Sequence, residues 1–454
     1  HSGIMASALP KCSSFKNVIK LGYATQAAVQ PKSTPTETGK FEVTKLPNGL
    51  HVLSSENHSP VAHIGIMLSA GSKYEKHNNL GVTHMLRLCS GFTNPSYTVF
   101  GNTRNLQQKG ISLTTTASRD YILYQISGLR DHCPDVSRFL AALSTNQNYK
   151  HWEVSDNKSS LARDVAYMKQ SPELELFEML HEAAFHLSGL GNSLYSPDCM
   201  VGKHSSSMLN DFVANHSKAG SALMFGVGID HKDLLSYAER LELPPGMVEP
   251  VDYPYFGGEI RKFTGGEYAN VMVAIKGAGL KDLKKTVALS ILKNILGNGI
   301  LTPWGHCTGQ LGKAGHKATS DNFAVSAFNA SYKTSGLLGF SLRGTASSMA
   351  QLVPAVYQEF IKTISGTVPA EELARGKAAT KLEMLSRLEQ SSEVGELIGS
   401  QLLCNSDFSI ENLLTAIDST TAVDIKNVIG NNPSLSLACS GNTSKVPYLT
   451  ELKP

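Results

Sequence analysis

The 454-residue sequence lacks several features that would identify large classes of proteins. No stretch approaches the roughly 18 uninterrupted apolar residues that a membrane-spanning helix requires. The nearest candidate runs from Val287 to Leu296, and it is short and contains Lys293. A charge excess of one sign is also missing, because the formal net charge is +3. This balance argues against nucleic acid or an anionic membrane as the main partner.

Closely spaced cysteines are absent as well. The seven cysteines are scattered, and no two form a Cys-x-x-Cys pair. Such a pattern is typical of reduced, buried thiols in a reducing compartment. The cysteine motifs that hold haem or iron–sulfur clusters are missing too, and no glycine pattern of a nucleotide site is complete. We therefore expect no cofactor. The 41% hydrophobic and 17% charged residues are ordinary for a globular protein.

Acidic residues are missing from the start of the sequence, where Glu37 is the first. Four lysines and many Ser, Ala and Thr residues precede it. A basic, Ser-rich segment without acids is typical of a mitochondrial transit peptide. We expect residues 1–40 to be a transit peptide and a polar linker, with Met5 as the start. A disordered tail is the plainer alternative.

Beyond residue 40, local patterns predict strands and helices in blocks. The turn sequence Leu46-Pro47-Asn48-Gly49 predicts a hairpin between strands 41–45 and 50–54. Alternating apolar residues predict further strands, and a Ser-Pro-Glu sequence at 171–173 marks a helix start. The expected strands are 64–68, 111–116, 121–127 and 222–228, and the expected helices are 78–90, 134–143, 152–170, 172–186, 207–215 and 232–241.

A cluster of prolines and glycines between residues 244 and 258 predicts an interdomain linker. After it the order of elements repeats, with strands at 271–275, 323–330 and 336–342 and helices at 282–296, 349–364 and 369–390. Segregated strands and helices favour an α+β class with mostly antiparallel sheets. We expect two similar domains at 41–242 and 257–454, joined by a linker at 243–256.

One expected helix contains the sequence His84-Met85-Leu86-Arg87-Leu88. Its context resembles the pitrilysin-type metallopeptidases, whose motif is H-x-x-E-H. In that motif two histidines on one helical face bind zinc, and the glutamate acts as general base. The resemblance covers almost the whole chain, and it implies the two-domain pitrilysin-like fold. The matching blocks are 41–53, 71–75, 79–81, 180–185 and 257–261.

The resemblance also implies which site residues have been lost. His84 stands at the first histidine of the motif, Arg87 at the glutamate and Leu88 at the second histidine. Asp164 stands at the position of the third ligand, 80 residues after His84 (164 − 84). Leucine has no lone pair, and arginine does not accept a proton near neutral pH. We expect no metal, no catalytic residue, and an Arg87–Asp164 ion pair. Taken alone, such a histidine is more often a core residue.

Some members of this family have lost activity, namely the α subunit of the mitochondrial processing peptidase and the core proteins of ubiquinol–cytochrome c reductase. Residues 296–303 lack the glycine-rich loop of the α subunit. Core protein 1 keeps the Glu-His end of the motif, whereas this chain keeps the first histidine. The resemblance therefore implies a structural subunit of a dimeric multisubunit complex, peripheral to the matrix side of the mitochondrial inner membrane. The implied partners are core protein 1, cytochrome b, cytochrome c1 and the Rieske iron–sulfur subunit.

Two other functions stay open at this point. The chain could be a presequence-binding module of the α-subunit type, or a peptidase with an unusual metal site. His181, His186 and Tyr332 are further polar residues in the matching regions, and packing or solvation is their simplest role.

Overall fold

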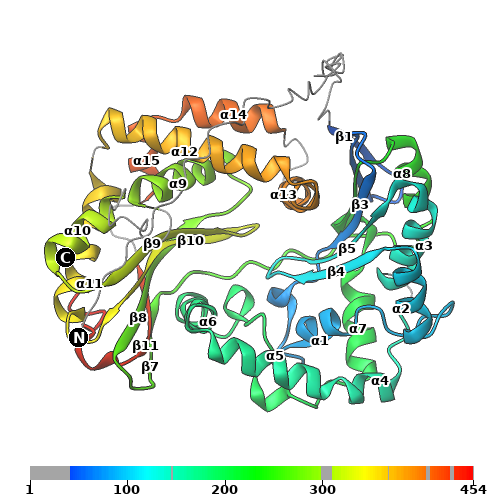
Figure 1. Cartoon of the computed structure of the whole chain (residues 1–454), viewed down its shortest axis with the longest axis horizontal. Coiled ribbons are helices and arrows are strands. Elements are labelled where there is room, and N and C mark those ends of the chain that lie inside the picture. The colour runs from blue at the N-terminus through cyan, green and yellow to red at the C-terminus, as the bar shows by residue number, and fades with distance from the viewer. Residues whose placement is uncertain are drawn as a thin grey trace, which may run out of the picture. The chain divides into compact units, whose positions relative to one another are not determined.

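The computed structural model describes residues 41–144, 147–297, 309–366, 368–404, 409–429 and 434–452. The expected transit peptide and linker at 1–40, and residues 298–303 of the segment compared with the glycine-rich loop, lie outside these residues. Within them the chain forms two sheets, each with helices packed on both faces (Figure 1).

The first sheet has six strands in the order β1-β2-β6-β3-β5-β4. Strands β2 and β6 are parallel, and the other neighbours are antiparallel. The hairpin expected at 41–54 is confirmed as β1 and β2, which pair from Phe41–Ser55 to Lys45–His51. The strands are β1 (Phe41–Lys45), β2 (His51–Ser55), β3 (Val61–Leu68), β4 (Ser112–Ala117), β5 (Ile122–Leu129) and β6 (Ala222–Val227).

The second sheet has five strands in the order β7-β11-β8-β10-β9. Strands β7 and β11 are parallel, and the other neighbours are antiparallel. Strand β7 was not predicted from the sequence. The strands are β7 (Gly258–Phe263), β8 (Tyr268–Ala278), β9 (Phe323–Ser331), β10 (Ser335–Thr345) and β11 (Leu435–Gly441).

The two sheets repeat one another strand by strand. The series β2-β6-β3-β5-β4 and β7-β11-β8-β10-β9 have the same order and the same parallel or antiparallel relation at each step. Strand β1 is an addition at the edge of the first sheet. The expected repeat of element order is therefore confirmed, as is an α+β fold with mostly antiparallel sheets.

The expected helices mostly follow their predicted ranges, with two differences. The helices at Val99–Gln108, Gln310–Ala318, Ser391–Cys404 and Ile410–Ser419 were not predicted. The helix expected at 78–90 is α1 (Val82–Leu88), because the preceding residues form turns. The helix expected at 152–170 is broken into α4 (His151–Asp156) and α5 (Lys158–Gln170) at Asn157. The remaining helices before the second sheet are α2 (Val99–Gln108), α3 (Cys133–Ser144), α6 (Pro172–Phe185), α7 (Ser206–His216) and α8 (His231–Ala238).

The helices of the second half surround α9, which packs against α10, α11, α12, α14 and α15. No helix in the described part of the chain is long and apolar enough to cross a membrane. These helices are α9 (Leu283–Leu296), α10 (Gln310–Ala318), α11 (Met349–Ser365), α12 (Ala370–Glu389), α13 (Ser391–Cys404), α14 (Ile410–Ser419) and α15 (Ala422–Val428).

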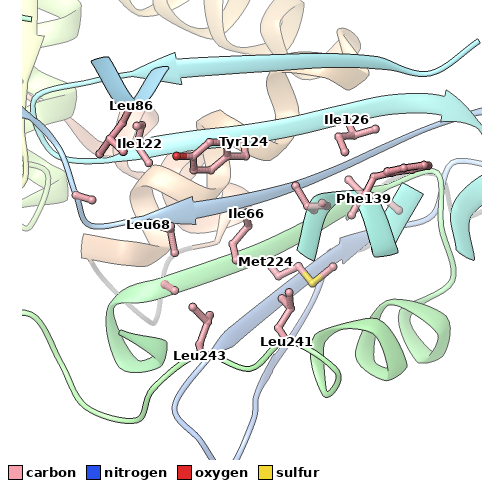
Figure 2. Close-up of a cluster of buried hydrophobic side chains, with 14 of the residues drawn as sticks. Ile66, Leu68, Leu86, Ile122, Tyr124, Ile126, Phe139, Met224, Leu241 and Leu243 are labelled. Carbon is pink, nitrogen blue, oxygen red and sulfur yellow. The ribbon is translucent and has the colours of Figure 1, made fainter. Parts of the chain in front are cut away.

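Each sheet has one face in a large apolar core built with helices of its own half. In the first sheet, Ile66 of β3, Tyr124 of β5 and Met224 of β6 point to this face, where Phe139 of α3 packs with them (Figure 2). Alternate residues of the same strands point to the opposite face, as the pleat requires. The equivalent core of the second sheet lies between its strands and α9 and α11.

The opposite face of each sheet is covered by a helix from the other half of the sequence. Helix α13 packs on β6 and β3 of the first sheet. Helix α6 packs on β11, β8 and β7 of the second sheet. The two halves therefore exchange one helix each, and neither sheet is covered by its own stretch of chain alone.

We call the surface on which each exchanged helix packs its seat. The centre of the α13 seat is apolar and closely packed, and Asn57, Tyr121 and Gln125 donate hydrogen bonds to α13 around it. Val394, Ile398 and Leu402 pack against the sheet. At Gly395 a Cβ atom would lie 2.0 Å from the ring of Phe225, so only glycine fits there. One turn later, at Gly399, a Cβ atom would meet the ends of the Leu223 and Met67 side chains at 3.1 and 3.4 Å.

The seat of α6 combines apolar packing with buried polar groups. The guanidinium of Arg119 donates to the Glu178 carboxylate at 2.8 Å, and the Arg119 side chain is 1% exposed. His181 Nδ1 lies 2.8 Å from the Phe177 carbonyl oxygen and donates to it. His181 Nε2 therefore accepts the hydrogen bond of the Tyr332 hydroxyl at 2.7 Å. This seat joins α6 to the turn between β9 and β10 through specific hydrogen bonds.

Candidate functional site

Helix α1 carries three of the four predicted site residues, and a buried carboxylate fixes its start. Glu75 accepts hydrogen bonds from the backbone N–H groups of Gly81 at 2.7 Å and Thr83 at 2.9 Å, and from the Thr83 hydroxyl at 2.5 Å. These bonds satisfy donors that a helix start leaves without partners. Gly81 has a φ of +79°, which favours glycine. Burial raises the pKa of Glu75 to about 7.

His84 and Asp164 are brought together by the packing of α1 against α5. The backbone N–H of Ser196 donates to His84 Nδ1 at 3.1 Å. The proton of the neutral ring is therefore on Nε2, which lies 3.3 Å from Asp164 Oδ2 and donates to it. His84 is completely buried. Burial, assisted by the charge of Arg87, lowers the pKa of His84 to about 4, so the ring is neutral at pH 7.

Arg87 forms the ion pair that the sequence predicted. One guanidinium nitrogen lies 2.7 Å from Asp164 Oδ2, the same oxygen that faces His84. Both partners are 32% exposed, so the pair lies at the surface. Exposed pairs of this kind stabilise a fold by less than about 1 kcal/mol. The main effect of Arg87 is therefore to hold and neutralise the Asp164 carboxylate.

Leu88 ends α1 and packs against the core of the first sheet. Its side chain offers no electron pair, and Arg87 offers only donors and a positive charge. His84 and Asp164 are the two remaining possible donors, whereas a catalytic zinc normally has three protein ligands and an open position. These four side chains do not fit a catalytic zinc. Among the residues that the structure describes, no group of three or more His, Cys, Asp and Glu side chains could hold a metal ion.

Three residues of this site were not singled out in the sequence. Tyr195 places its ring edge-on to His84 with centroids 5.3 Å apart, Ser196 sets the histidine tautomer, and Glu75 fixes the start of α1. Glu75 carried no local signal, because it precedes Gly81, the N-cap of α1, by six residues (81 − 75) and so lies outside a capping pattern. Tyr195 and Ser196 follow α1 by more than 100 residues, and no local pattern connects them with it.

The other polar residues noted in the sequence take packing roles. His181 and Tyr332 meet in the seat of α6. His186 ends that helix with a φ of +58° and stacks on Phe256, with ring centroids 4.5 Å apart. Neither histidine contacts His84 or Asp164 in any described interaction.

Comparisons with known families agree with this architecture. Residues 51–198 match the insulinase family, peptidase family M16. Residues 205–380 match the peptidase M16 inactive domain. The first match includes all four predicted site positions, and the second begins before the last strand of the first sheet.

Among individual proteins, the chain is 35% identical to the human mitochondrial cytochrome b-c1 complex subunit 2, over 98% of this chain and 99% of that protein. It is 28% identical to the α subunit of the potato mitochondrial-processing peptidase, over 90% and 84% of the two chains. The fold is similar to that of a chain in the complex III2 structure from Candida albicans. That likeness has a TM-score of 0.79 at 16% identity and covers 90% of this chain and 98% of the other.

Proposed function

Because the chain belongs to peptidase family M16, and its similarity to the cytochrome b-c1 complex subunit 2 extends over nearly its whole length, we propose that it is a non-catalytic core subunit of the mitochondrial ubiquinol–cytochrome c reductase complex. In this proposal the chain is core protein 2, and its function is to support the assembly and stability of the complex. The single observation that carries the proposal is the 35% identity over 98% of the chain.

The proposed lack of catalysis is supported by the side chains at the site. We infer that Arg87 replaces the general base and that Leu88 replaces one zinc ligand. Arg87 also occupies the Asp164 oxygen that would otherwise be a metal ligand, at 2.7 Å. A guanidinium repels a divalent cation and cannot polarise water as a base. His84 and Asp164 would remain as the two vestigial positions of the site.

The proposed partners follow from the same similarity. They are core protein 1, cytochrome b, cytochrome c1 and the Rieske iron–sulfur subunit in a dimeric complex. We propose a location on the matrix side of the inner membrane, with the chain held there by its partners, after removal of a transit peptide within residues 1–40. We also propose domain boundaries at 41–242 and 257–454 around a linker at 243–256.

The alternative is an α-type subunit that binds presequences in the mitochondrial processing peptidase. It is supported by 28% identity to the potato α subunit. This identity is lower than the 35% to the human cytochrome b-c1 complex subunit 2, and the match covers less of both chains. Affinity purification of the tagged full-length chain from detergent-solubilised mitochondria separates the two. We expect haem-containing partners with the absorption bands of b- and c-type cytochromes. Recovery of a soluble, haem-free heterodimer would support the α-type subunit instead.

Metal analysis tests the proposed loss of catalysis directly. We expect less than about 0.1 zinc per chain after equilibration with zinc and desalting, since three ligands are normally needed. We expect the triple variant Arg87→Glu, Leu88→His and Asp164→Glu to bind about one zinc. The single variant Asp164→Glu is the control and should stay metal-free. Stoichiometric zinc in the unmodified chain, with cleavage of a presequence peptide, would show that it is an enzyme.

A further inference from the structure

A concave surface of about 490 Å³ lies beside the turn that connects β8 to α9. This volume is within the range of about 300–1,000 Å³ that small-molecule sites usually have. The turn is formed by residues 279–282, and α9 begins directly after it. The residues of the lining that matter here are Lys276, Lys281, Asp282, Lys285 and Thr334. We call this surface the β8–α9 concavity.

Positive charge dominates the β8–α9 concavity. Three lysines line it, and Asp282 is the only acidic residue on the described lining. Asp282 is already engaged, because its carboxylate caps α9 by accepting the Lys285 N–H at 3.2 Å and pairs with Lys285 Nζ at 3.0 Å. Within the described ranges, the side chains of Lys276 and Lys281 have no ion-pair partner. At least two positive charges therefore face this space without compensation.

Neighbouring groups strengthen the positive potential. Lys333 precedes Thr334 of the lining and lies close enough to interact with Lys281. Burial is the main cause of the lowered pKa of Lys333. The charges of Lys73 and Lys281 lower it further, as expected where lysines lie close together, and Cys404 and Asp120 act in the opposite direction. Helix α9 has 14 residues, and its amino end adds a partial positive charge at the same place. Asp120 is a nearby acid, but it is engaged by Lys73 and by the Lys333 backbone N–H.

We propose that the β8–α9 concavity binds a phosphate-bearing anion. Lys276 is on the last part of β8 and Lys281 is beyond its end, whereas Lys285 is in the first turn of α9. These ammonium groups come from three separate positions on one lining. A phosphate group presents several charged oxygens to donors in different directions, whereas a single carboxylate has one charge to share. Lysine binds phosphate as a point charge, without the bidentate geometry of arginine.

Two sources of this chemistry fit, a soluble phosphate compound and the headgroup of an anionic phospholipid. The test compares the full-length chain with the variant Lys276→Gln, Lys281→Gln, Lys285→Gln. The matched control is Lys203→Gln, Lys232→Gln, Lys445→Gln, which removes the same charge from exposed lysines without a described ion pair. All substituted side chains are exposed, so both variants should fold, and thermal unfolding checks this.

Binding of inorganic pyrophosphate is measured by calorimetry, and binding to vesicles by flotation. The vesicles contain phosphatidylcholine with or without phosphatidylglycerol. We expect the concavity variant to bind at least one probe about tenfold more weakly than the unmodified chain, a change of about 1.4 kcal/mol. The control should change by less than about twofold. Loss of pyrophosphate binding assigns a soluble ligand, and loss of binding to anionic vesicles alone assigns a headgroup. Equal losses in both variants, or no binding of either probe, would overturn the proposal.

Discussion

Helices α6 and α13 occupy equivalent places, each covering the sheet of the other half, but different interactions hold them. The centre of the α13 seat is apolar, and Gly395 lets the ring of Phe225 approach the helix backbone closely, while the Tyr121 hydroxyl donates to Glu396 of α13 beside it. The α6 seat contains a buried guanidinium, a buried imidazole and a hydrogen-bonded tyrosine beside its apolar contacts. Close packing tolerates few changes of volume, whereas a buried polar network tolerates few changes of partner.

The difference shows two ways to fix one geometry. Apolar contacts between α13 and the first sheet are not directional, so the position of α13 depends on the shape around Phe225 and on the few hydrogen bonds beside it. In the α6 seat, Arg119, His181 and Tyr332 meet only in one alignment of the helix, the β4–β5 turn and the β9–β10 turn. The stability of the α13 seat should therefore depend mainly on the size of the side chains in it. The stability of the α6 seat should depend on its hydrogen-bonding groups and on pH.

The largest expected effect is in the polar seat. Arg119→Met removes the cation from Glu178, which is 11% exposed, and leaves a mostly buried carboxylate with only the Leu194 N–H donating to it. We expect the free energy of unfolding to fall by about 3–5 kcal/mol, measured by urea denaturation. The double variant Arg119→Met, Glu178→Leu should recover a large part of the loss. If the double variant is as unstable as the single one, the lost packing of Arg119 matters more than the stranded charge.

A smaller change in the apolar seat should depend on position. Gly395→Ala places a methyl group within 2.0 Å of the Phe225 ring, and we expect a loss of about 1–3 kcal/mol from overpacking. Gly399→Ala is the same substitution one turn later, where flexible side-chain ends can move away. Alanine favours a helix by about 1 kcal/mol over glycine, so the control should be nearly neutral. Equal effects of the two variants would show that the ring of Phe225 does not set the seat.

The two seats should also differ in how their stability responds to acidification. Burial, and to a lesser extent the charge of Arg119, lowers the pKa of His181 well below its ordinary value. The folded seat therefore holds the ring neutral while the open form takes up a proton. The contribution of the neutral ring to the stability of the seat is fully present above a pH of about 6.5. It falls as the pH decreases below that value, by up to about 1.4 kcal/mol per pH unit. Hydrogen exchange between pH 7 and 5, corrected for intrinsic rates, measures this.

We expect α6 to lose protection over that interval and α13 to keep it. In the variant His181→Gln the pH dependence of α6 should disappear, because glutamine does not titrate. An equal loss of protection in both helices would mean that the difference in chemistry does not control the opening of the seats.

The smallest expected effect tests a single hydrogen bond. Tyr332→Phe leaves His181 Nε2 without the hydroxyl that donates to it at 2.7 Å. We expect a loss of about 1 kcal/mol in the free energy of unfolding. Tyr357→Phe is the control, because Tyr357 is buried and no hydrogen bond of its hydroxyl is described. A neutral Tyr332→Phe variant would mean that packing alone holds this part of the α6 seat.

The sequence predicted the parts of the fold that have a local periodic signal. Alternation in Ile64–Leu68 identified β3, and the repeat of elements identified the second sheet. Helix α13 was not predicted. The exchange of α6 and α13 was also beyond sequence reasoning, because it depends on contacts between residues such as Phe225 and Gly395 that are far apart in the chain.

The candidate site was predicted by spacing and resemblance rather than by composition. The Arg87–Asp164 contact was expected from an 80-residue offset between His84 and Asp164 and is present at 2.7 Å. The tautomer of His84 could not be predicted, because it depends on one backbone N–H of a distant loop. The polar network around Arg119 was missed for the same reason, since its members come from separate turns and helices.

The exchange of helices also determines when the first sheet can be fully covered during synthesis of the chain. Strand β6 ends at Val227 and α13 begins at Ser391, which is 164 residues later (391 − 227). At about 5–20 residues per second, the first sheet waits roughly 10–30 s for its second cover. During that time Met67, Leu223 and Phe225 have no α13 to cover them. The nascent chain therefore exposes an apolar, aggregation-prone surface during this interval. The yield of folded protein should depend on chaperones that act before the last sixty or so residues are made.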